Sequence, residues 1–282
     1  MKIGVVGSGF VGKATQTLHH DNTYLYVYDI IPELCQPVNA TLKDMHVCDI
    51  IFICVPTPCG ANGECHLGIV DSVVTELQQH IDPNTTHIVI RSTVPPGTSK
   101  KYGVFFMPEF LTERNYINDF INNENWVVGL TQDEQKNTRF KGKIQELFTS
   151  AKNSGNIMSD NLHFSPSCEA EMVKYIKNCF LATKVSFFNE MYKICESIGL
   201  NYNDVRHLVA LDTRIGNSHT YVPGPDGKRG FGGICFPKDI RALQTLAHTN
   251  EVPTPVLTAA ITRNSTIDRP EADWKVKGRS IV

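Results

Sequence analysis

The sequence predicts an α/β fold in the first half of the chain and a helical region in the second. Short apolar runs alternate with amphipathic segments over the first half, a pattern typical of a parallel sheet covered by helices. Residues 167–198 contain neither glycine nor proline, with acidic residues near the start and Gly199 at the end, which predicts one long helix.

The apolar runs of the first half predict the strands. Several are continuously apolar, as expected for strands that are covered on both faces. A helix is expected over residues 71–80, between two of them. The predicted strands are residues 3–6, 24–28, 50–55, 87–91, 103–107 and 126–129.

Three glycines follow the first strand in the spacing G-x-G-x-x-G. Gly7 permits a tight turn, Gly9 lets a diphosphate approach the backbone, and Gly12 lets the next helix pack closely on the strand. That helix, expected from Lys13, would present its N-terminal amides to phosphates. These features predict a Rossmann-type dinucleotide-binding domain.

Asp29 ends the second predicted strand. An acid at this place binds a ribose 2′-hydroxyl and repels a 2′-phosphate, so we expect NAD rather than NADP. Phe10 and Val11 of the glycine turn are expected to contact the same cofactor.

Two further turns follow the third and fourth strands. The first contains Val55, Pro56 and Thr57, and the second contains Thr93. Ligands of open α/β sheets bind beyond the carboxyl ends of the strands, so both turns are expected near the cofactor.

Cys235 stands in a glycine-rich turn, directly before a predicted helix start at Pro237. The glycines allow a ligand to approach the sulfur. Lys238 and the helix N-terminus favour the thiolate, which is the nucleophilic form, and Asp239 adds an acid near that helix end. The alternative is a buried structural cysteine in a tight turn.

Lys174 and Asn178 lie four residues apart on the long predicted helix and therefore on one side of it. In a cleft they would stabilise an oxyanion or exchange a proton. A solvated helix face is the alternative.

Composition narrows the function classes. The chain has 282 residues and a formal net charge of −2, which gives no electrostatic case for nucleic-acid binding. No apolar stretch reaches membrane-spanning length, and the first apolar run leads into the glycine turn rather than forming a signal peptide. The nine cysteines lack the paired spacing of zinc sites, so we expect no metal and a reducing cytoplasm.

The domain organisation follows from these patterns. Residues 1–165 are expected to form the NAD-binding Rossmann domain, and residues 166–270 a helical domain that carries Cys235. Shorter helices are expected over 240–248 and 255–267, and residues 271–282 read as a short tail.

Taken in order, the motifs resemble those of the UDP-glucose/GDP-mannose dehydrogenase family. The matching segments are residues 7–12 with Asp29, and residues 55–58, 91–94, 107–113, 169–178, 188–190, 212–216 and 230–239. The resemblance implies a four-electron oxidation of the C6 alcohol of a nucleotide sugar by two NAD⁺, most simply UDP-glucose to UDP-glucuronate, a precursor of polysaccharides. It also implies a homodimer.

The resemblance further implies residue roles. Cys235 would capture the C6 aldehyde as a thiohemiacetal, which a second oxidation turns into a thioester. Lys174 and Asn178 would stabilise the C6 oxygen, with Lys174 as a candidate proton acceptor. Asp239 and Thr93 would hold a water that assists proton transfer.

Further roles concern hydrolysis and binding. Glu109 resembles the glutamate that assists thioester hydrolysis, although Glu113 stays open as the base. Arg214 resembles an arginine that reaches the sugar nucleotide of a neighbouring subunit. The sugar is expected against Phe110, Leu111, Phe231 and Gly232, and Glu113 and Lys238 are expected near the cofactor.

Two departures from the family pattern accompany the match. Family members carry a third, C-terminal α/β domain over the nucleotide, which residues 271–282 are too few to form, and the loop at residues 217–229 differs from the expected aromatic-rich loop. Two alternatives therefore stay open. One is a two-electron β-hydroxyacid-type dehydrogenase, and the other is a non-catalytic nucleotide-sugar-binding protein.

Overall fold

The computed structural model describes residues 1–60 and 62–275. It contains two compact units. The first comprises Met1–Thr57 and Leu67–Lys174, and the second comprises Pro58–His66 together with the chain from Tyr175 onward. A short segment of the N-terminal half thus belongs to the second unit.

The first unit is built on a seven-stranded sheet in the order β2-β1-β3-β4-β5-β6-β7. All neighbouring strands pair in parallel except β5 and β6, which are antiparallel. The α/β prediction is therefore confirmed. The strands are β1 (Lys2–Val6), β2 (Tyr24–Tyr28), β3 (Ile50–Ile53), β4 (His87–Ile90), β5 (Phe105–Phe106), β6 (Trp126–Leu130) and β7 (Leu162–Pro166).

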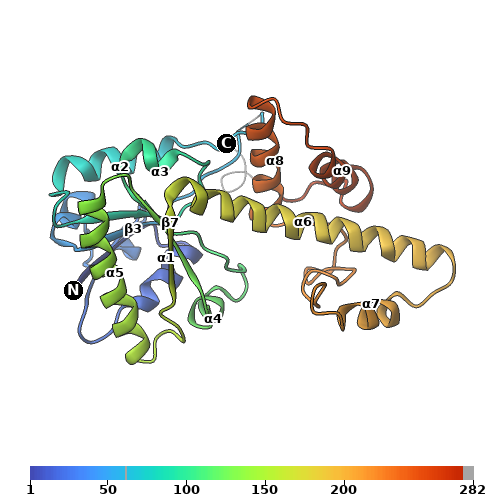
Figure 1. The fold of residues 1–282 in the computed structure, drawn as a ribbon, viewed down its shortest axis with the longest axis horizontal. Helices are drawn as coiled ribbons and strands as arrows, with labels where there is room; N and C mark the ends of the chain where they lie inside the picture. Colours follow the sequence, from blue (N-terminus) through green and yellow to red (C-terminus); the bar gives the residue numbers. More distant parts are fainter. Residues whose placement is uncertain (61, 276–282) are drawn as a thin grey trace. The chain divides into compact units, whose positions relative to one another are not determined.

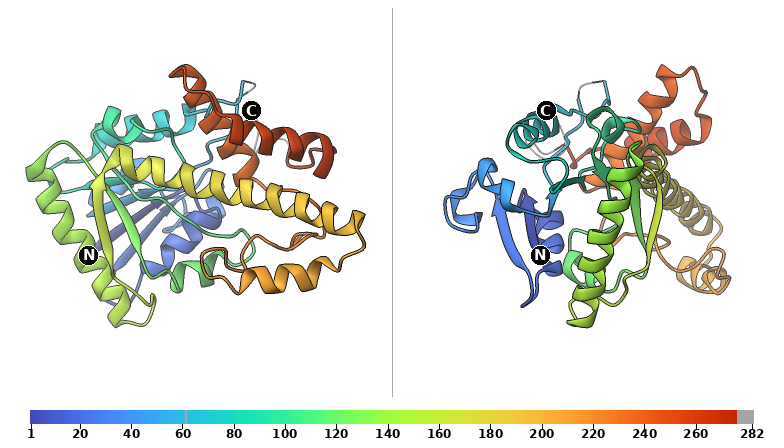
Figure 2. Two further views of the ribbon diagram at one scale, coloured as in Figure 1. Left: turned by 45° about the vertical axis from the view of Figure 1, so that its right-hand side comes forward. Right: turned by 60° about the vertical axis from the view of Figure 1, so that its left-hand side comes forward.

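Helices cover both faces of this sheet (Figures 1 and 2). One face packs apolar side chains against α1, α4 and α5, and the other packs against α2 and a 3₁₀ helix, η3. The helical elements of this unit are α1 (Phe10–Thr15), η1 (Gln16–Leu18), η2 (Pro32–Leu34), η3 (Leu42–Val47), α2 (Gly68–His80), α3 (Thr98–Tyr102), α4 (Tyr116–Ile121) and α5 (Glu134–Asn153).

The long predicted helix is present as α6 (Ser167–Ser197), which runs from the first unit into the second (Figure 1). Its early turns are fastened to the first unit by Glu171, a fully buried side chain. The Glu171 carboxylate accepts hydrogen bonds from the backbone N–H of Gly97 at 2.6 Å and of Ser99 at 2.8 Å. Burial raises the pKa of Glu171, and these hydrogen bonds oppose the rise.

The second unit is helical. One apolar cluster packs α6 against α8 and α9, and another packs α6 against α7. The remaining elements are α7 (Tyr202–Ala210), α8 (Cys235–Thr249), α9 (Pro255–Arg263) and a π-helical turn, η4 (Asn264–Asp268).

Several predicted boundaries were wrong. The first helix begins at Phe10 rather than Lys13, and α8 begins at Cys235 rather than at the predicted Pro237. Strand β7 was not predicted, because it is an edge strand with a half-exposed, mixed sequence that gives no apolar run. Part of the predicted tail, residues 276–282, lies outside the described residues.

Within the described residues, no helix combines the length and the apolar character needed to span a membrane. The same part of the chain holds no group of three or more His, Cys, Asp or Glu side chains that would hold a metal ion.

Candidate functional site

The glycine turn lies at the point where the strand order reverses. The chain passes from β1 to β2 on one side and continues to β3 on the other side of β1, which leaves the carboxyl ends of β1 and β3 open to a ligand. Gly7 has a positive φ of 91°, and its N–H donates to Tyr28 O at 2.8 Å. A side chain at Gly12 would overlap Gly7 O, whereas no atom lies within 4 Å of a Cβ built on Gly9.

These glycines meet the requirements of a bound diphosphate. Gly12 provides the close helix–strand contact, and Gly9 leaves room beside the backbone. Helix α1 begins at Phe10, so the amides of Phe10 and Val11 lie in its first turn, where they have no partner within the helix. The residues present therefore fit a dinucleotide.

Asp29 lies directly at this turn. Its Oδ2 accepts from Ser8 N–H at 2.6 Å, and its Oδ1 accepts from Ile31 N–H at 3.0 Å. These contacts fix the carboxylate at the end of β2, as the binding of a ribose diol requires.

The two predicted turns after β3 and β4 are joined by hydrogen bonds. Ser92 N–H donates to Ile53 O at 3.1 Å, and the Ser92 hydroxyl donates to Val55 O at 2.7 Å. Thr57 and Thr93 are buried, while Pro56 and, further along the chain, Glu113 are exposed.

Lys174 forms a buried ion pair with Glu109 in the first unit. The Lys174 ammonium donates to Glu109 Oε1 and to Glu109 O, both at 2.6 Å, and the side chains are only 3% and 5% exposed. Glu109 Oε2 accepts from Leu111 N–H at 2.8 Å, and the ammonium lies 5.5 Å from the centre of the Phe110 ring. The alternative of a solvated face for Lys174 is therefore wrong.

In the second unit, a fully buried Asp239 receives two donors. Asn178 Nδ2 donates to Asp239 Oδ2 and Lys238 Nζ donates to Asp239 Oδ1, both at 2.6 Å. A buried carboxylate needs such partners, because an unpaired one would cost several kcal/mol. Lys238 thus balances the charge of Asp239 in a buried ion pair. Asn178 donates to the second oxygen of the Asp239 carboxylate.

Cys235 is the first residue of α8 and is partly exposed. Burial alone would lower the pKa of Lys238, yet Asp239, Cys65 and Cys235 around it raise that pKa above its ordinary value. The Lys238 ammonium is therefore retained close to the Cys235 sulfur. A nearby cation and a helix N-terminus are features that favour a thiolate, and here Asp239 offsets part of the charge of the cation.

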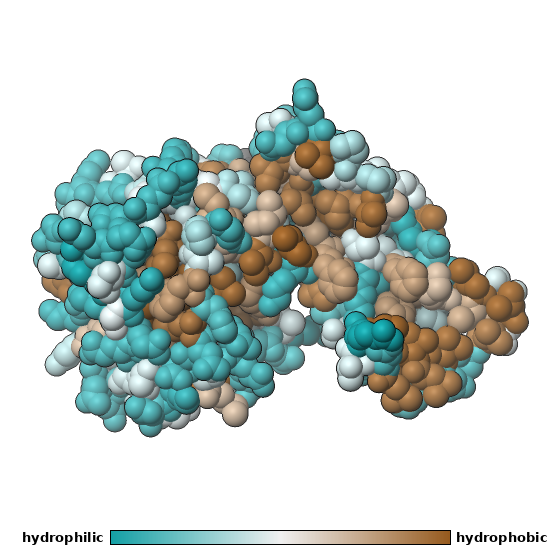
Figure 3. Space-filling view, viewed as in Figure 1, coloured by the Kyte–Doolittle hydropathy of each residue, from teal (hydrophilic) through white to brown (hydrophobic). Residues whose placement is uncertain are grey.

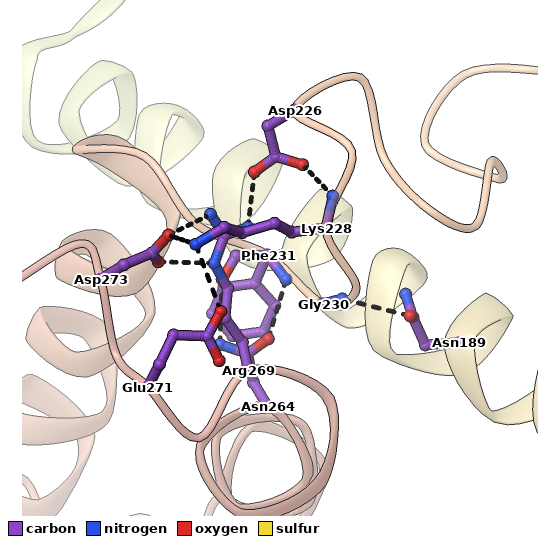
Figure 4. A network of polar contacts seen from close by, with 9 residues as sticks. All are labelled: Asn189, Asp226, Lys228, Gly230, Phe231, Asn264, Arg269, Glu271 and Asp273. Carbon is purple, nitrogen blue, oxygen red and sulfur yellow. Dashed lines mark hydrogen bonds and ion pairs between the residues drawn. The ribbon is translucent and has the colours of Figure 1, made fainter.

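The turn before Cys235 is held by residues that sequence reasoning missed (Figure 4). The Asn264 side chain forms two hydrogen bonds with the backbone of Phe231. Its Oδ1 accepts from Phe231 N–H at 2.8 Å, and its Nδ2 donates to Phe231 O at 2.9 Å. Asn189 Oδ1 accepts from Gly230 N–H at 3.1 Å. Amide side chains that match a backbone N–H or C=O leave no signal in sequence spacing.

Arg269 is the second missed residue of this turn. Its buried guanidinium lies so close to Gly232 that any side chain there would overlap it. Arg269 donates to Asp226 at 2.6 Å and to both carboxylate oxygens of Asp273, at 2.6 and 2.9 Å (Figure 4). The absence of a side chain at position 232 leaves the space that this guanidinium occupies.

Arg214 lies apart from these groups on the surface of the second unit. Its side chain is 88% exposed and forms a 2.6 Å ion pair with Asp212. It borders an apolar groove between α6 and α7, lined by Phe180, Phe187, Ile194 and Val209 among others.

Known proteins are similar to this chain in sequence. The NAD-binding domain of the UDP-glucose/GDP-mannose dehydrogenase family matches residues 35–152, and its central domain matches residues 168–266. UDP-glucose 6-dehydrogenase of Rickettsia prowazekii is 35% identical over 255 residues, which cover 83% of this chain and 55% of that protein. The chain thus spans about half the length of the curated relatives that it matches.

Solved structures share the fold. A UDP-glucose dehydrogenase from the archaeon Pyrobaculum islandicum superimposes with a TM-score of 0.77 at 23% identity, covering 94% of this chain and 68% of that one. A 3-hydroxyisobutyrate dehydrogenase of Mycobacterium tuberculosis gives a TM-score of 0.71 at 16% identity, covering 96% of this chain and 95% of that one.

The fold therefore agrees with both classes of dehydrogenase, and the sequence decides between them. The two family domains match in their expected order, and the glycine turn and Asp29 precede the residues that the NAD-binding domain matches. The chain belongs to the UDP-glucose/GDP-mannose dehydrogenase family.

Proposed function

We propose that the chain catalyses the NAD-dependent, four-electron oxidation of the C6 hydroxymethyl group of a nucleotide sugar, with UDP-glucose as substrate and UDP-glucuronate as product. The observation that carries the proposal is the place of Cys235, at the first residue of α8 and next to the retained Lys238 ammonium. A two-electron β-hydroxyacid dehydrogenase does not require a nucleophilic thiol.

The chemistry follows from covalent capture. The glycine turn would hold NAD, which would supply the hydride acceptor for each oxidation. The Cys235 sulfur forms a bond to the carbonyl carbon of the C6 aldehyde while the carbonyl oxygen takes a proton, which gives a thiohemiacetal. Loss of hydride from that carbon, together with loss of the hydroxyl proton, gives a thioester. Water then breaks the carbon–sulfur bond, releasing the carboxylate and returning the thiol.

Buried polar groups support this chemistry. We assign the Lys174 ammonium and the Asn178 amide to the C6 oxygen, where a developing negative charge requires fixed donors. Glu109 suits the hydrolytic step better than Glu113, because Glu109 is buried and held by Lys174 and Leu111 whereas Glu113 is exposed. A water held by Thr93 and Asp239 stays a prediction, as do the sugar contacts of Phe231 and Gly232.

We further propose a homodimer formed through the apolar face of α6 and α7. Figure 3 shows apolar side chains gathered over α7 and the adjoining part of α6. On α6, Phe180 is 65% and Phe187 is 54% exposed, and on α7 Leu208 is 65% exposed. A patch of this kind marks an interaction site. Arg214, at its border, would reach the substrate of the partner subunit.

The cysteines support a reducing compartment, and we propose the cytoplasm. All nine are without a disulfide in the part of the chain that the structure describes. Cytosolic proteins keep their thiols reduced.

Replacing Asp29 tests the cofactor assignment. Asp29→Ala should weaken NAD binding about tenfold and raise the relative use of NADP, because the ribose loses an acceptor and a 2′-phosphate is no longer repelled. Fluorescence titration with both cofactors measures the change. Asp21→Ala, an exposed acid before β2, is the control. An unchanged NAD/NADP preference contradicts the assignment.

Replacing Cys235 tests covalent capture. Cys235→Ser should lower acid formation by at least about a thousandfold, since a hydroxyl of ordinary pKa is a poor nucleophile, while NAD binding is kept. Product analysis by mass spectrometry measures the acid. Cys168→Ser, a partly exposed thiol at the start of α6, should keep its activity. Wild-type acid formation by Cys235→Ser refutes the mechanism.

Charging the apolar face tests the dimer. The double variant Phe180→Glu/Leu208→Glu should sediment as a monomer where the wild type sediments as a dimer, because carboxylates would be buried without partners. Val38→Glu changes an equally exposed apolar residue of the first unit and should leave the dimer intact. A monomeric wild-type protein excludes the proposal.

A further inference from the structure

Two cysteines face each other in the segment Pro58–His66. Cys59 and Cys65 are antiparallel bridge partners. The flanking hydrogen bonds run from Gly60 N–H to Glu64 O at 2.7 Å and from His66 N–H to Pro58 O at 2.8 Å. These bonds bracket the cysteines without joining them, so the pair is of the non-hydrogen-bonded type, in which opposing side chains are closest.

This arrangement suits a disulfide. The Cα atoms of a non-hydrogen-bonded antiparallel pair lie about 4.5 Å apart, within the range that a disulfide spans without backbone movement. We propose that Cys59 and Cys65 form a reversible disulfide, which makes this segment a modification site for small aliphatic disulfides of the glutathione type. The inference does not depend on the proposed oxidation of a sugar.

The surroundings give the two thiols different roles. Cys65 is partly exposed, whereas Cys59 is 6% exposed. Burial raises the pKa of Cys59, and the nearby Lys238 and Arg241 cations oppose the rise. Cys65 also interacts electrostatically with the Lys238 ammonium, and this interaction contributes to the raised pKa of Lys238. The accessible Cys65 is therefore the thiol that meets a reagent, and Cys59 is the thiol that resolves the product.

The exchange is balanced. The Cys65 thiolate attacks one sulfur of the small disulfide, which forms a mixed disulfide at Cys65 and releases one small thiol. The Cys59 thiolate then attacks Cys65 Sγ, forms the intramolecular bond and releases the second small thiol. Two protein thiols are oxidised, one small disulfide is reduced, and no other oxidant is needed.

Other cysteines are less suited to this reaction. Burial raises the pKa of Cys54 to about 11 and the pKa values of Cys48 and Cys179 to about 12. A thiol of such high pKa holds little thiolate near neutral pH, and the thiolate is the attacking form. Among described residues, the pair of Cys59 and Cys65 combines an accessible thiol with a partner directly opposite it.

The disulfide would fasten a segment that packs on α8. Thr245 Oγ1 donates to Asn62 O at 3.1 Å, and a side chain at Gly63 would press against the same threonine. Gly63 has a positive φ of 87°, which fits the tight return of the chain between the two cysteines. Oxidation would thus close a loop held against the helix that begins at Cys235.

Glu64 makes the test direct, because a glutamyl endopeptidase cleaves between the two cysteines. The wild-type protein is incubated with oxidised glutathione, its remaining thiols are alkylated, and it is then digested. The fragment 65–76 should stay joined to the fragment 34–64, and dithiothreitol should separate them. A fragment 65–76 that carries alkylated Cys65 or a lasting glutathione adduct, or that is joined to the fragment with Cys235, overturns the proposal.

Variants identify the partner. Cys59→Ser should leave fragment 65–76 unjoined and should trap Cys65 as a mixed disulfide with glutathione. Cys35→Ser makes the same change elsewhere in fragment 34–64 and should leave the fragments joined. Joined fragments in Cys59→Ser would assign the bond to another cysteine and refute the pairing. The wild-type measurement decides the question even where a variant fails to fold.

Discussion

Helix α6 is the constraint on which the remaining structure depends. Over 31 residues without glycine or proline, it presents Glu171, Lys174 and Asn178 on one face at intervals of three and four residues. All three side chains are buried. Each side chain therefore needs a partner of opposite charge or a hydrogen-bonding partner. Each of the three has one.

The partners come from different parts of the chain. The Glu171 carboxylate accepts hydrogen bonds from two backbone N–H groups in the segment after β4. Lys174 forms an ion pair with Glu109, which follows β5, and Asn178 donates a hydrogen bond to Asp239 of α8. Leaving one partner of a buried ion pair alone costs about 3–5 kcal/mol. The register of α6 is thereby set in both units by polar contacts as well as by apolar packing. The groups assigned to catalysis are also groups on which folding depends.

Much of the fold could be predicted from the sequence, because its signals are local. The glycine turn, Asp29 after β2 and the uninterrupted run of α6 each depend on residues that are close together in the chain. Strand β7 was missed because an edge strand of mixed polarity resembles a loop. The sequence predicts the start of α8 at Pro237, which is two residues too late, because a proline fits anywhere in the first turn of a helix.

The candidate site was less predictable. Sequence patterns singled out Cys235, Lys174 and Asn178 by residue type, but they contain no information on partners far away in the chain. The hydrogen bonds between Asn264 and Phe231, and the close contact between Arg269 and Gly232, form only when the helices pack together. The sequence likewise shows Cys59 and Cys65 six positions apart, and only the backbone pairing sets them opposite each other.

We propose that one thiol, that of Cys235, allows two successive oxidations of the same carbon. A progress curve with limiting UDP-glucose and excess NAD⁺, counting NADH formed per sugar consumed, tests it most directly. Two NADH per sugar are expected, with UDP-glucuronate as the product. One NADH per sugar would contradict it and indicate a two-electron dehydrogenase or a released aldehyde, and the absence of NADH would contradict UDP-glucose as the substrate.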